Sequence, residues 1–575
     1  MNHTGHGTAL TAVCGVLSAD LPADTQRAQQ IAACAETEGV TFTRRHTGEN
    51  IMVWGTDALG LVEGENHLAA GWTTAGAPDG HQLNQPWPQL ARVADACGVR
   101  AEPGQWPLVH GHVSGAGVVY VLPTTRAVFF ATRLRWLAQT AEQLAPDWQS
   151  WAEILAFGAP LGGATTFTRI RRLQPMEYVE LTDQGPRLGR EHWPWEDYEP
   201  RAGASVAEAT AEVIEHFTAV MRPHLSTEAG PAAHPMLSGG RDSRLLTALA
   251  ARHADAPVPV TGWSTSSDTG SALEQIVAAD VAHTLGVDHR VVVGRYSEFG
   301  RDFAHYADAV DHQASFHVWL MPAARQLAQA TPGTVFDGIG GGVFYGGGFA
   351  DPPGTASTQL ATTRIQARSH YLHAAGAVLS ADAAQTLTAR AAERAWPIAR
   401  RYTGHPNGHT LTSYLIRTVP GISLAPTKVL GSAQPTVTPM LTDPAIRCAM
   451  ELPAEAKTDG RWYPELLTTA DARLQGVPTA DDLLGTHHHK RRIASREGAG
   501  YLAQLIGTSP VYTLLSRRLA EADPADPTGL VTWQRTLNST RPQHLLRGLG
   551  MLALWLEDYA DVLTDTDPRG VADAG

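Results

Sequence analysis

The chain has little cysteine, no long hydrophobic run and no excess of positive charge. Its 575 residues include four cysteines, too few for a disulfide framework and not paired as in a metal motif, which fits a reducing cytoplasm. No apolar run reaches the roughly 18 residues that a membrane-spanning helix needs. The opening residues 1–6 lack the basic and apolar regions of a signal peptide. We therefore expect a cytoplasmic protein with no membrane span.

The charge balance makes a nucleic-acid partner unexpected. The formal net charge is −13, whereas a protein that neutralises phosphates along a nucleic acid needs a basic footprint. The lysine-bearing phosphate loop G-x-x-x-x-G-K-[ST] is also absent. A hydrophobic content of 43% with 18% charged residues is typical of a folded globular chain, and the length predicts two or more domains.

The predicted secondary structure changes near residue 200. Up to about residue 181, short apolar strands alternate with turns, and the runs 117–122 and 127–131 predict a hairpin. The Trp- and Pro-containing stretch 193–203 is typical of a linker. Beyond it, amphipathic helices, beginning with 207–222, alternate with short apolar strands, as in a parallel α/β sheet. We expect a β-rich domain over residues 1–200 and an α/β domain over residues 201–575.

The stretch 235–246 predicts a phosphate-binding loop between a strand and a helix. Its glycines can expose backbone N–H groups, and the helix N-terminus favours an anion. Its serines add hydroxyl donors, and its aspartate can hold a Mg²⁺ ion that bridges phosphates. The predicted nucleotide contacts are Leu237, Ser238, Gly239, Gly240, Arg241, Asp242 and Ser243, with Asp242 as a magnesium ligand. The alternative is a glycine turn that binds nothing.

This loop resembles the Ser-Gly-Gly-x-Asp-Ser pyrophosphate loop of enzymes that cleave ATP between its α and β phosphates. Segment 258–264 resembles the strand whose backbone contacts adenine, the spaced residues from Glu274 to His289 match a second pattern, and 335–347 resembles a second glycine-rich loop. The second half is thus similar to the synthetase domain of asparagine synthetases, beta-lactam synthetases and lasso-peptide cyclases. The resemblance implies ATP and Mg²⁺ as cofactors. It also implies nucleotide contacts at Trp263, Ser264, Asp337 and Gly338.

The first half resembles the other domain of the same family through segments 129–137 and 157–176. The implied fold class is α/β plus β-rich: an N-terminal Ntn-type glutaminase-like sandwich and a C-terminal α/β ATP-pyrophosphatase domain. Cys14 opens a stretch similar to the family's Cys-Gly-Ile start, where a terminal cysteine uses its own amine as base. Residues 1–13 precede it here, so without cleavage we expect an inactive glutaminase, with Cys14 a buried strand residue. Glutamine would then supply no ammonia, and the amine that accepts the activated acyl group would belong to the substrate.

The second glycine-rich loop departs from the family pattern. The family's Glu, or the Tyr of beta-lactam synthetases, aligns with Ile339, and its second magnesium-binding Asp aligns with Gly342. Asp337 could replace that ligand. The two changes count against an ordinary asparagine synthetase and against a beta-lactam synthetase. The glycines would leave room for a substrate bulkier than an amino acid.

Two segments supply candidate catalytic residues. The stretch 485–500 resembles a loop that carries a late lysine in ring-forming relatives, which makes Lys490 or Arg492 a candidate to stabilise charge on phosphorus and pyrophosphate. A solvated basic loop without a role is the alternative. Asp311 and His312 occupy the place of an acidic residue in relatives and are acid/base candidates. A capping Asp beside a surface His remains the alternative.

The resemblance implies ATP-dependent formation of an intramolecular amide. A carboxylate would be activated as an acyl-adenylate and then meet an amine of the same molecule at high effective concentration. The closest fit is a lasso-peptide cyclase, a macrolactam synthetase acting on a leader-free precursor peptide alongside a leader-binding protein and a leader peptidase. The alternatives are a small-molecule amide synthetase and a non-catalytic scaffold that binds ATP or a partner.

Overall fold

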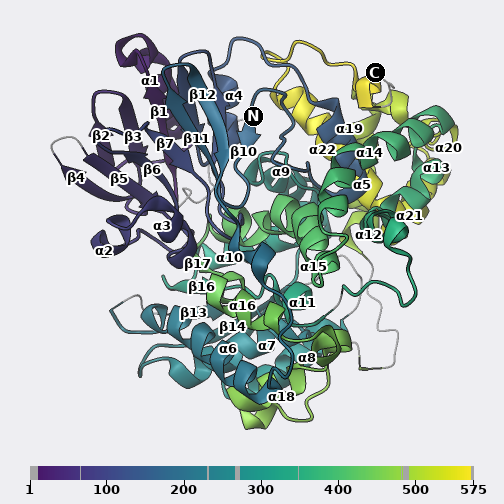
Figure 1. Cartoon of the computed structure of the whole chain (residues 1–575). Coiled ribbons are helices and arrows are strands. Elements are labelled where there is room, and N and C mark those ends of the chain that lie inside the picture. Colours follow the sequence, from purple (N-terminus) through teal and green to yellow (C-terminus); the bar gives the residue numbers. More distant parts are fainter. Residues whose placement is uncertain are drawn as a thin grey trace.

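A computed structural model describes residues 11–64, 67–228, 232–265, 272–347, 349–480, 482–483 and 491–571. Figure 1 shows three regions: two β-sheets formed by the first third of the chain, a group of parallel strands with helices, and a helical region that includes the last described helices. The mixed α/β class expected from the sequence is confirmed.

The first region has two six-stranded antiparallel sheets. The first sheet has the order β10-β8-β9-β1-β3-β2, with β1 Val13–Ser18, β2 Arg44–Thr47, β3 Ile51–Gly55, β8 Tyr120–Pro123, β9 Ala127–Ala131 and β10 Arg171–Arg172. The second has the order β12-β11-β7-β6-β5-β4, with β4 Gly60–Gly64, β5 His67–Trp72, β6 Cys97–Ala101, β7 Leu108–His110, β11 Glu177–Thr182 and β12 Gly185–Arg190. The predicted hairpin is confirmed, because Pro123 pairs with Val128 where β8 turns into β9.

Alternation along the strands separates an inner face from an outer one. On β1, Val13 and Leu17 belong to the core between the two sheets, whereas Cys14 and Val16 pack on the other side with helix α1 (Leu21–Thr37). This is the period-2 pattern of a strand that is buried on both faces. Helices α2 (Gly80–Leu83) and α3 (Trp87–Val93) contact the second sheet. The resulting order of layers is helix, sheet, sheet and helix.

The second region carries two small parallel sheets. One has the order β13-β16-β17, with β13 Ala233–Pro235, β16 Thr334–Phe336 and β17 Thr436–Val437; the other pairs β14 (Thr261–Thr265) with β15 (Asp288–Val292). Around them lie α6 Val206–Met221, α7 Arg241–His253, α8 Leu273–Leu285, α10 Met321–Leu327, α11 Gly341–Phe344, α16 Asp443–Glu451, α17 Ala454–Lys457 and α18 Tyr463–Ala470. The predicted parallel strands and the helix near 207–222 are confirmed.

The third region is helical and draws on both halves of the sequence. Its members are α5 Trp148–Phe157, α9 Phe299–Ala309, α12 Leu360–Arg368, α13 Ala375–Val378, α14 Ala381–Arg401, α15 Gly408–Ser413, α19 Arg496–Gly507, α20 Arg517–Ala520, α21 Pro527–Leu537 and α22 Thr540–Asp558. Helix α4 (Leu134–Gln139) lies instead against the first sheet, beside α1 and β9. Two π-helical segments, Tyr414–Ile422 and Ala425–Leu430, join it to β17. Helix α5 packs against α14 and α22, so one hydrophobic core crosses the division expected near residue 200.

The stretch expected to be a linker is packed rather than loose. Trp193 and Trp195 are buried, and the Trp195 Nε1–H donates to Asp443 Oδ1 at 2.9 Å. The Tyr198 hydroxyl donates to the same oxygen at 2.8 Å, and Arg92 Nε–H donates to Asp443 Oδ2 at 2.6 Å. The expectation of a simple linker is therefore wrong, because its aromatic side chains fill the junction between α3 and α16.

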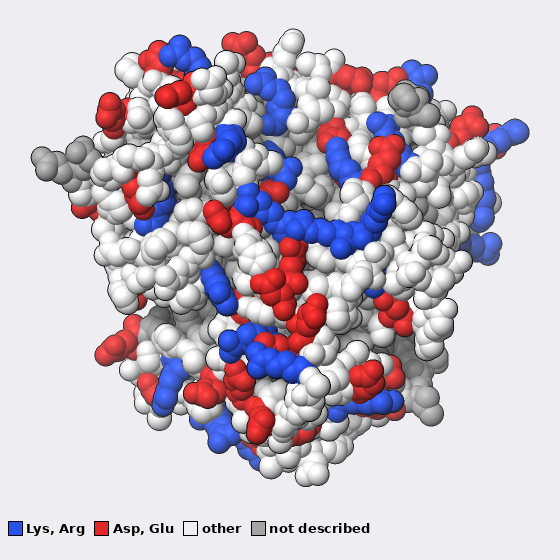
Figure 2. Space-filling model, in the orientation of Figure 1, with Lys and Arg blue, Asp and Glu red and all other residues white. Residues whose placement is uncertain are grey.

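The described surface carries charges of both signs. Figure 2 shows Lys and Arg interspersed with Asp and Glu over the face drawn. Within the described residues, no helix combines the length and the apolar character that crossing a membrane requires.

Candidate nucleotide-binding and catalytic site

The loop between β13 and α7 closes on itself through its two serines. The Ser238 N–H donates to Ser243 Oγ at 3.0 Å, and the two hydroxyl oxygens lie 3.0 Å apart. The Gly240 N–H donates to Ser238 Oγ at 3.1 Å. Leu237, which enters the loop, is buried and donates its N–H to the Trp263 carbonyl at 2.8 Å. The predicted strand, tight loop and helix are therefore confirmed as local structure.

Two charged side chains stabilise this loop through hydrogen bonds to its backbone. Arg244 is buried and donates to the carbonyls of Gly239 and Gly240, each at 3.0 Å, and to Val477 O at 2.9 Å. Glu274, at the start of α8, accepts the Gly239 N–H at 2.7 Å. Arg244 is absent from the set predicted from the sequence. Its position four residues after Gly240, on the same face of α7, is the signal that could have found it.

The N-terminus of α7 faces the same loop. Gly240 is its N-cap residue, and no side chain in the described structure caps the first turn. The first N–H groups of a helix lack intrahelical partners and carry partial positive charge, which suits a phosphate. Arg241 adds a guanidinium that lies over the Tyr463 ring, 5.9 Å from its centre. Backbone donors and a cation therefore meet at the loop.

Asp242 is fixed by two donors from other elements. The Tyr463 hydroxyl, on α18, donates to Asp242 Oδ1, and the Gly342 N–H, on α11, donates to the same carboxylate. Burial raises the pKa of Asp242 to about 6, although these two hydrogen bonds act in the opposite direction and the charge of Asp337 adds to the rise. A carboxylate held in this way is costly to ionise without a neighbouring cation.

Asp337 is the second carboxylate of the site. It follows β16, and its Oδ1 accepts the Ile339 N–H at 2.9 Å. Burial raises its pKa to about 6. Gly338 lies so near Asp242 that a Cβ on it would approach the Asp242 Cβ to 3.0 Å. One carboxylate in the first turn of α7 and one directly after β16 form a donor set that a Mg²⁺ ion accepts.

The two positions at which the second glycine-rich loop departs from the family pattern have different surroundings. Ile339 is buried in the same hydrophobic core as Leu237 and Leu441, so its side chain packs among apolar groups. Gly342 is exposed, and a Cβ on it would have no described atom within 4 Å. The neighbouring Gly341 differs, because a Cβ there would overlap the Asp242 carboxylate.

The side chains of Trp263 and Ser264 are already occupied within the protein. Trp263 is buried, and its Nε1–H donates to His234 Nδ1 at 3.2 Å. Ser264 Oγ donates to Leu237 O at 2.6 Å and lies 2.7 Å from His289 Nε2. Any contact of this strand with a nucleotide would therefore involve its backbone.

The candidate cations lie apart from the two carboxylates or outside the described chain. Lys490 lies outside the described residues, as does most of the basic stretch around it. Arg492 donates to Asp302 Oδ2 at 2.7 Å and lies over the Phe299 ring, 5.7 Å from its centre. Asp302 is fully buried and also pairs with Arg325. The Arg492 guanidinium therefore neutralises a buried carboxylate on α9.

Asp311 and His312 lie in a separate buried cluster. Asp311 Oδ1 is 3.1 Å from Arg133 Nε, and its Oδ2 is 3.5 Å from Lys428 Nζ. His312 Nε2 is 3.2 Å from Asp558 Oδ2. Within the described residues, no hydrogen bond or ion pair joins either of them to the loop before α7. The alternative of a surface histidine is wrong, because His312 is buried.

A cavity of about 460 Å³ opens beside this cluster, between the first region and the helices. Thr132, Arg133 and Lys428 contribute to its wall. Cys14 lies nearby on β1 and is fully buried, and burial raises the pKa of its thiol well above the usual range. A thiol in this state is a poor nucleophile.

A match to a known protein family agrees with this geometry. Residues 229–467 match the family model described as asparagine synthase, and this range contains β13, the loop, Asp242, Asp337 and Tyr463. A search of the curated proteins finds no match. Residues 229–467 are therefore similar to the asparagine synthase domain, and this similarity supports an ATP-dependent, amide-forming synthetase.

Proposed function

We propose that this protein uses ATP to activate a peptide carboxylate and closes it on an amine of the same peptide. The observation that carries the proposal is the pair Asp242 and Asp337, placed beside a strand–loop–helix whose helix has no side-chain cap within the described residues. Loops of this kind bind the phosphates of a nucleotide. The family match supports amide synthesis with ATP. The peptide substrate is the finer part of the proposal.

In the first step, a carboxylate oxygen attacks the α-phosphorus of ATP, the bond to the β-phosphate breaks, and pyrophosphate leaves. The N–H groups at the start of α7 and the Ser238 and Ser243 hydroxyls bind the pyrophosphate oxygens. Asp242 and Asp337 would hold Mg²⁺, which when bound neutralises phosphate charge. Tyr463 and the Gly342 N–H keep Asp242 in one orientation, and Arg244 keeps the loop closed.

In the second step, an uncharged amine attacks the acyl carbon, and AMP leaves as the amide forms. Two features support an amine from the substrate itself. Cys14 is fully buried, and without cleavage before it the backbone nitrogen of Cys14 is a peptide amide that continues into Val13 and not the terminal amine of a glutaminase. The open space at Gly342 favours a large acceptor over ammonia. An intramolecular reaction would gain from the high effective concentration of the amine.

The peptide would be a leader-free precursor, which implies a leader-binding protein and a leader peptidase as partners in the cytoplasm. These partners follow from the proposed reaction and its family resemblance. An N-terminal Ntn-type glutaminase-like domain without glutaminase activity is part of the same proposal. The observed layers of helix, sheet, sheet and helix support it.

The test is pyrophosphate and AMP release with candidate precursor peptides, with mass spectrometry of the product. We expect one AMP and one pyrophosphate for each peptide that loses one water. Asp242→Asn should abolish turnover, whereas the matched change Asp280→Asn, on the exposed face of α8, should not. Product from a small amino acid alone would favour a small-molecule synthetase. If the protein binds ATP but no carboxylate substrate causes release of AMP or pyrophosphate, only the alternative of a non-catalytic scaffold remains.

A further inference from the structure

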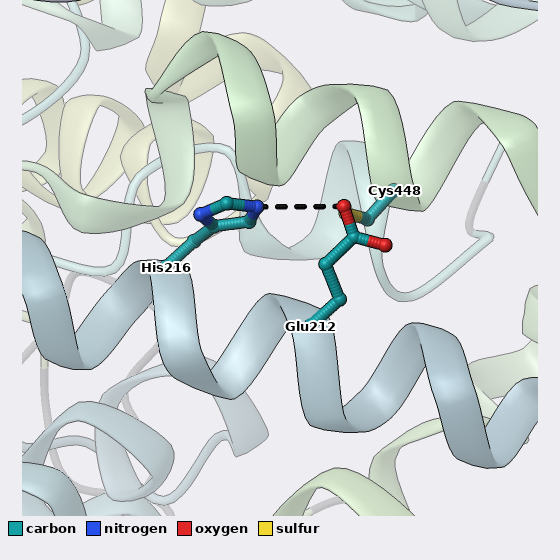
Figure 3. Close-up of side chains that lie close together, drawn as sticks. All are labelled: Glu212, His216 and Cys448. Carbon is teal, nitrogen blue, oxygen red and sulfur yellow. Dashed lines mark ion pairs between the residues drawn. The ribbon is translucent and has the colours of Figure 1, made fainter.

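Three ligand-type side chains of different chemistry meet on the outer side of the second region. Glu212 and His216 project from α6, one turn apart, toward Cys448 on α16 (Figure 3). One ligand atom from each lies within 4.8 Å of the other two. Residues at i and i+4 share a helix face, which explains how α6 offers two ligands to a third on its neighbour.

Of the three groups, His216 is the least satisfied by its surroundings in the described structure, whereas Glu212 also pairs with Arg447. His216 Nε2 is buried and has no hydrogen-bond partner in the described structure; the nearest charged atom is Glu212 Oε1 at 3.6 Å. Cys448 is 4% exposed and forms no disulfide. A buried imidazole nitrogen without a hydrogen bond is uncommon and requires an explanation. Arg447 approaches the group as well, and its guanidinium lies 3.0 Å from Glu212 Oε1.

We propose that Glu212, His216 and Cys448 bind a divalent transition-metal ion of the zinc type, which joins α6 to α16. Zn²⁺ accepts thiolate, imidazole and carboxylate ligands together, whereas Mg²⁺ and Ca²⁺ select oxygen ligands. The Cys448 thiol loses its proton to solvent when the ion binds. The partly exposed Glu212 leaves the fourth position open to water, as in zinc sites with three protein ligands.

The site would stabilise the helices that support the nucleotide loop. Thr210, on the same helix as Glu212, accepts the Trp462 Nε1–H at 2.7 Å. Trp462 precedes Tyr463, whose hydroxyl holds Asp242. Glu212 is two residues from Thr210 on α6. An ion that fixes α6 against α16 would therefore stabilise this chain of contacts at its first member. The inference does not depend on the proposed reaction, because the ligands contact neither the loop nor Asp337 in the described chain.

The test uses the full chain after treatment with a chelator, titrated with Co²⁺ as a spectroscopic probe and then with Zn²⁺. We expect a thiolate-to-cobalt charge-transfer band that saturates at one equivalent and disappears when Zn²⁺ displaces the cobalt. Cys448→Ser should abolish the band, and His216→Ala should weaken cobalt binding at least tenfold. The matched control Cys34→Ser, on α1, should keep the band. Arg447→Ala should strengthen binding, because it removes a cation that competes for Glu212.

Cobalt bound only by the histidines of segment 487–489 would give no thiolate band. The charge-transfer band therefore distinguishes binding at that segment from binding at the proposed site. The proposal is overturned if the wild-type chain gives no such band, or if the band survives in Cys448→Ser. A zinc-dependent rise in the melting temperature that is lost in Cys448→Ser and in His216→Ala would be an independent confirmation. No such rise in the wild-type chain would also contradict the proposal. All variants are checked for native secondary structure by circular dichroism.

Discussion

The hydroxyl of Tyr463 on α18 donates a hydrogen bond to the carboxylate of Asp242 on α7. The Asp242 side chain thus depends on an element more than 200 residues away in the sequence. A hydrogen bond to a charged group contributes about 1.5–3 kcal/mol. We expect Tyr463→Phe to lower kcat for pyrophosphate release by roughly tenfold or more, because about 1.4 kcal/mol corresponds to a factor of ten. Unchanged turnover would show that Tyr463 has no part in positioning Asp242.

Two adjacent glycines of α11 offer a matched pair of substitutions. A Cβ at Gly341 would overlap the Asp242 carboxylate, whereas a Cβ at Gly342 would meet no described atom. We expect Gly341→Ala to reduce turnover by roughly a hundredfold or more, since a displacement of about 1 Å can cost that much. Gly342→Ala should stay near the wild-type rate. Equal effects of the two changes on pyrophosphate release would contradict the described position of Asp242.

Asp443 joins the packed stretch after β12 to α16 and α3. It accepts hydrogen bonds from Arg92, Trp195 and Tyr198. Asp443→Ala would leave the buried Trp195 and Tyr198 donors unpaired, so we expect a loss of about 3 kcal/mol in the free energy of unfolding. Asp443→Asn keeps one acceptor oxygen and should lose less. Denaturant titration followed by tryptophan fluorescence measures both, and equal losses would contradict the hydrogen-bond explanation.

The buried carboxyl of Glu153 on α5 should make stability depend on pH. Burial raises its pKa from 4.5 to about 7, although Arg394 and the Leu161 N–H oppose the rise. The folded state therefore holds this proton more tightly than the unfolded state. The stabilising effect is complete below pH 4.5 and is lost as the pH rises to about 7. The change over this window is roughly 3 kcal/mol.

Glu153→Gln should flatten this part of the pH profile of unfolding, because a glutamine does not titrate. The exposed Glu455→Gln on α17 serves as the control and should leave the profile unchanged. Chemical unfolding measured at closely spaced pH values between acid and neutral tests the difference. A Glu153→Gln profile as steep as that of the wild-type chain would assign the slope to other groups.

Local structure near strong signals could be predicted from the sequence. The β8–β9 hairpin, helix α6 and the strand–loop–helix before Ser243 follow from alternation, helical periodicity and small-residue turns, which act over a few residues. The neighbourhood of Asp242 and Asp337 could be inferred because both follow parallel strands of one sheet.

Long-range contacts could not be predicted in the same way. The role of Tyr463 depends on which distant segments meet the loop, and no local pattern encodes that meeting. Arg492 fits a motif position, yet its nearest strong partner is the buried Asp302, because a buried carboxylate is stabilised by each guanidinium that reaches it. The tryptophans of the stretch 193–203 show the same limit, since their burial requires the surface that α16 provides.

The packing of helix α5 against late parts of the sequence affects how the chain folds during synthesis and where it can be cut into fragments. Leu144, just before α5, exchanges backbone hydrogen bonds with the segment after α22: its N–H donates to Val562 O at 2.8 Å, and its carbonyl accepts from the Thr564 N–H at 3.0 Å. A ribosome releases α5 some 400 residues before these partners. The nascent chain must therefore expose an apolar helix until α22 emerges, and a fragment that ends near residue 200 keeps that helix exposed, which favours aggregation.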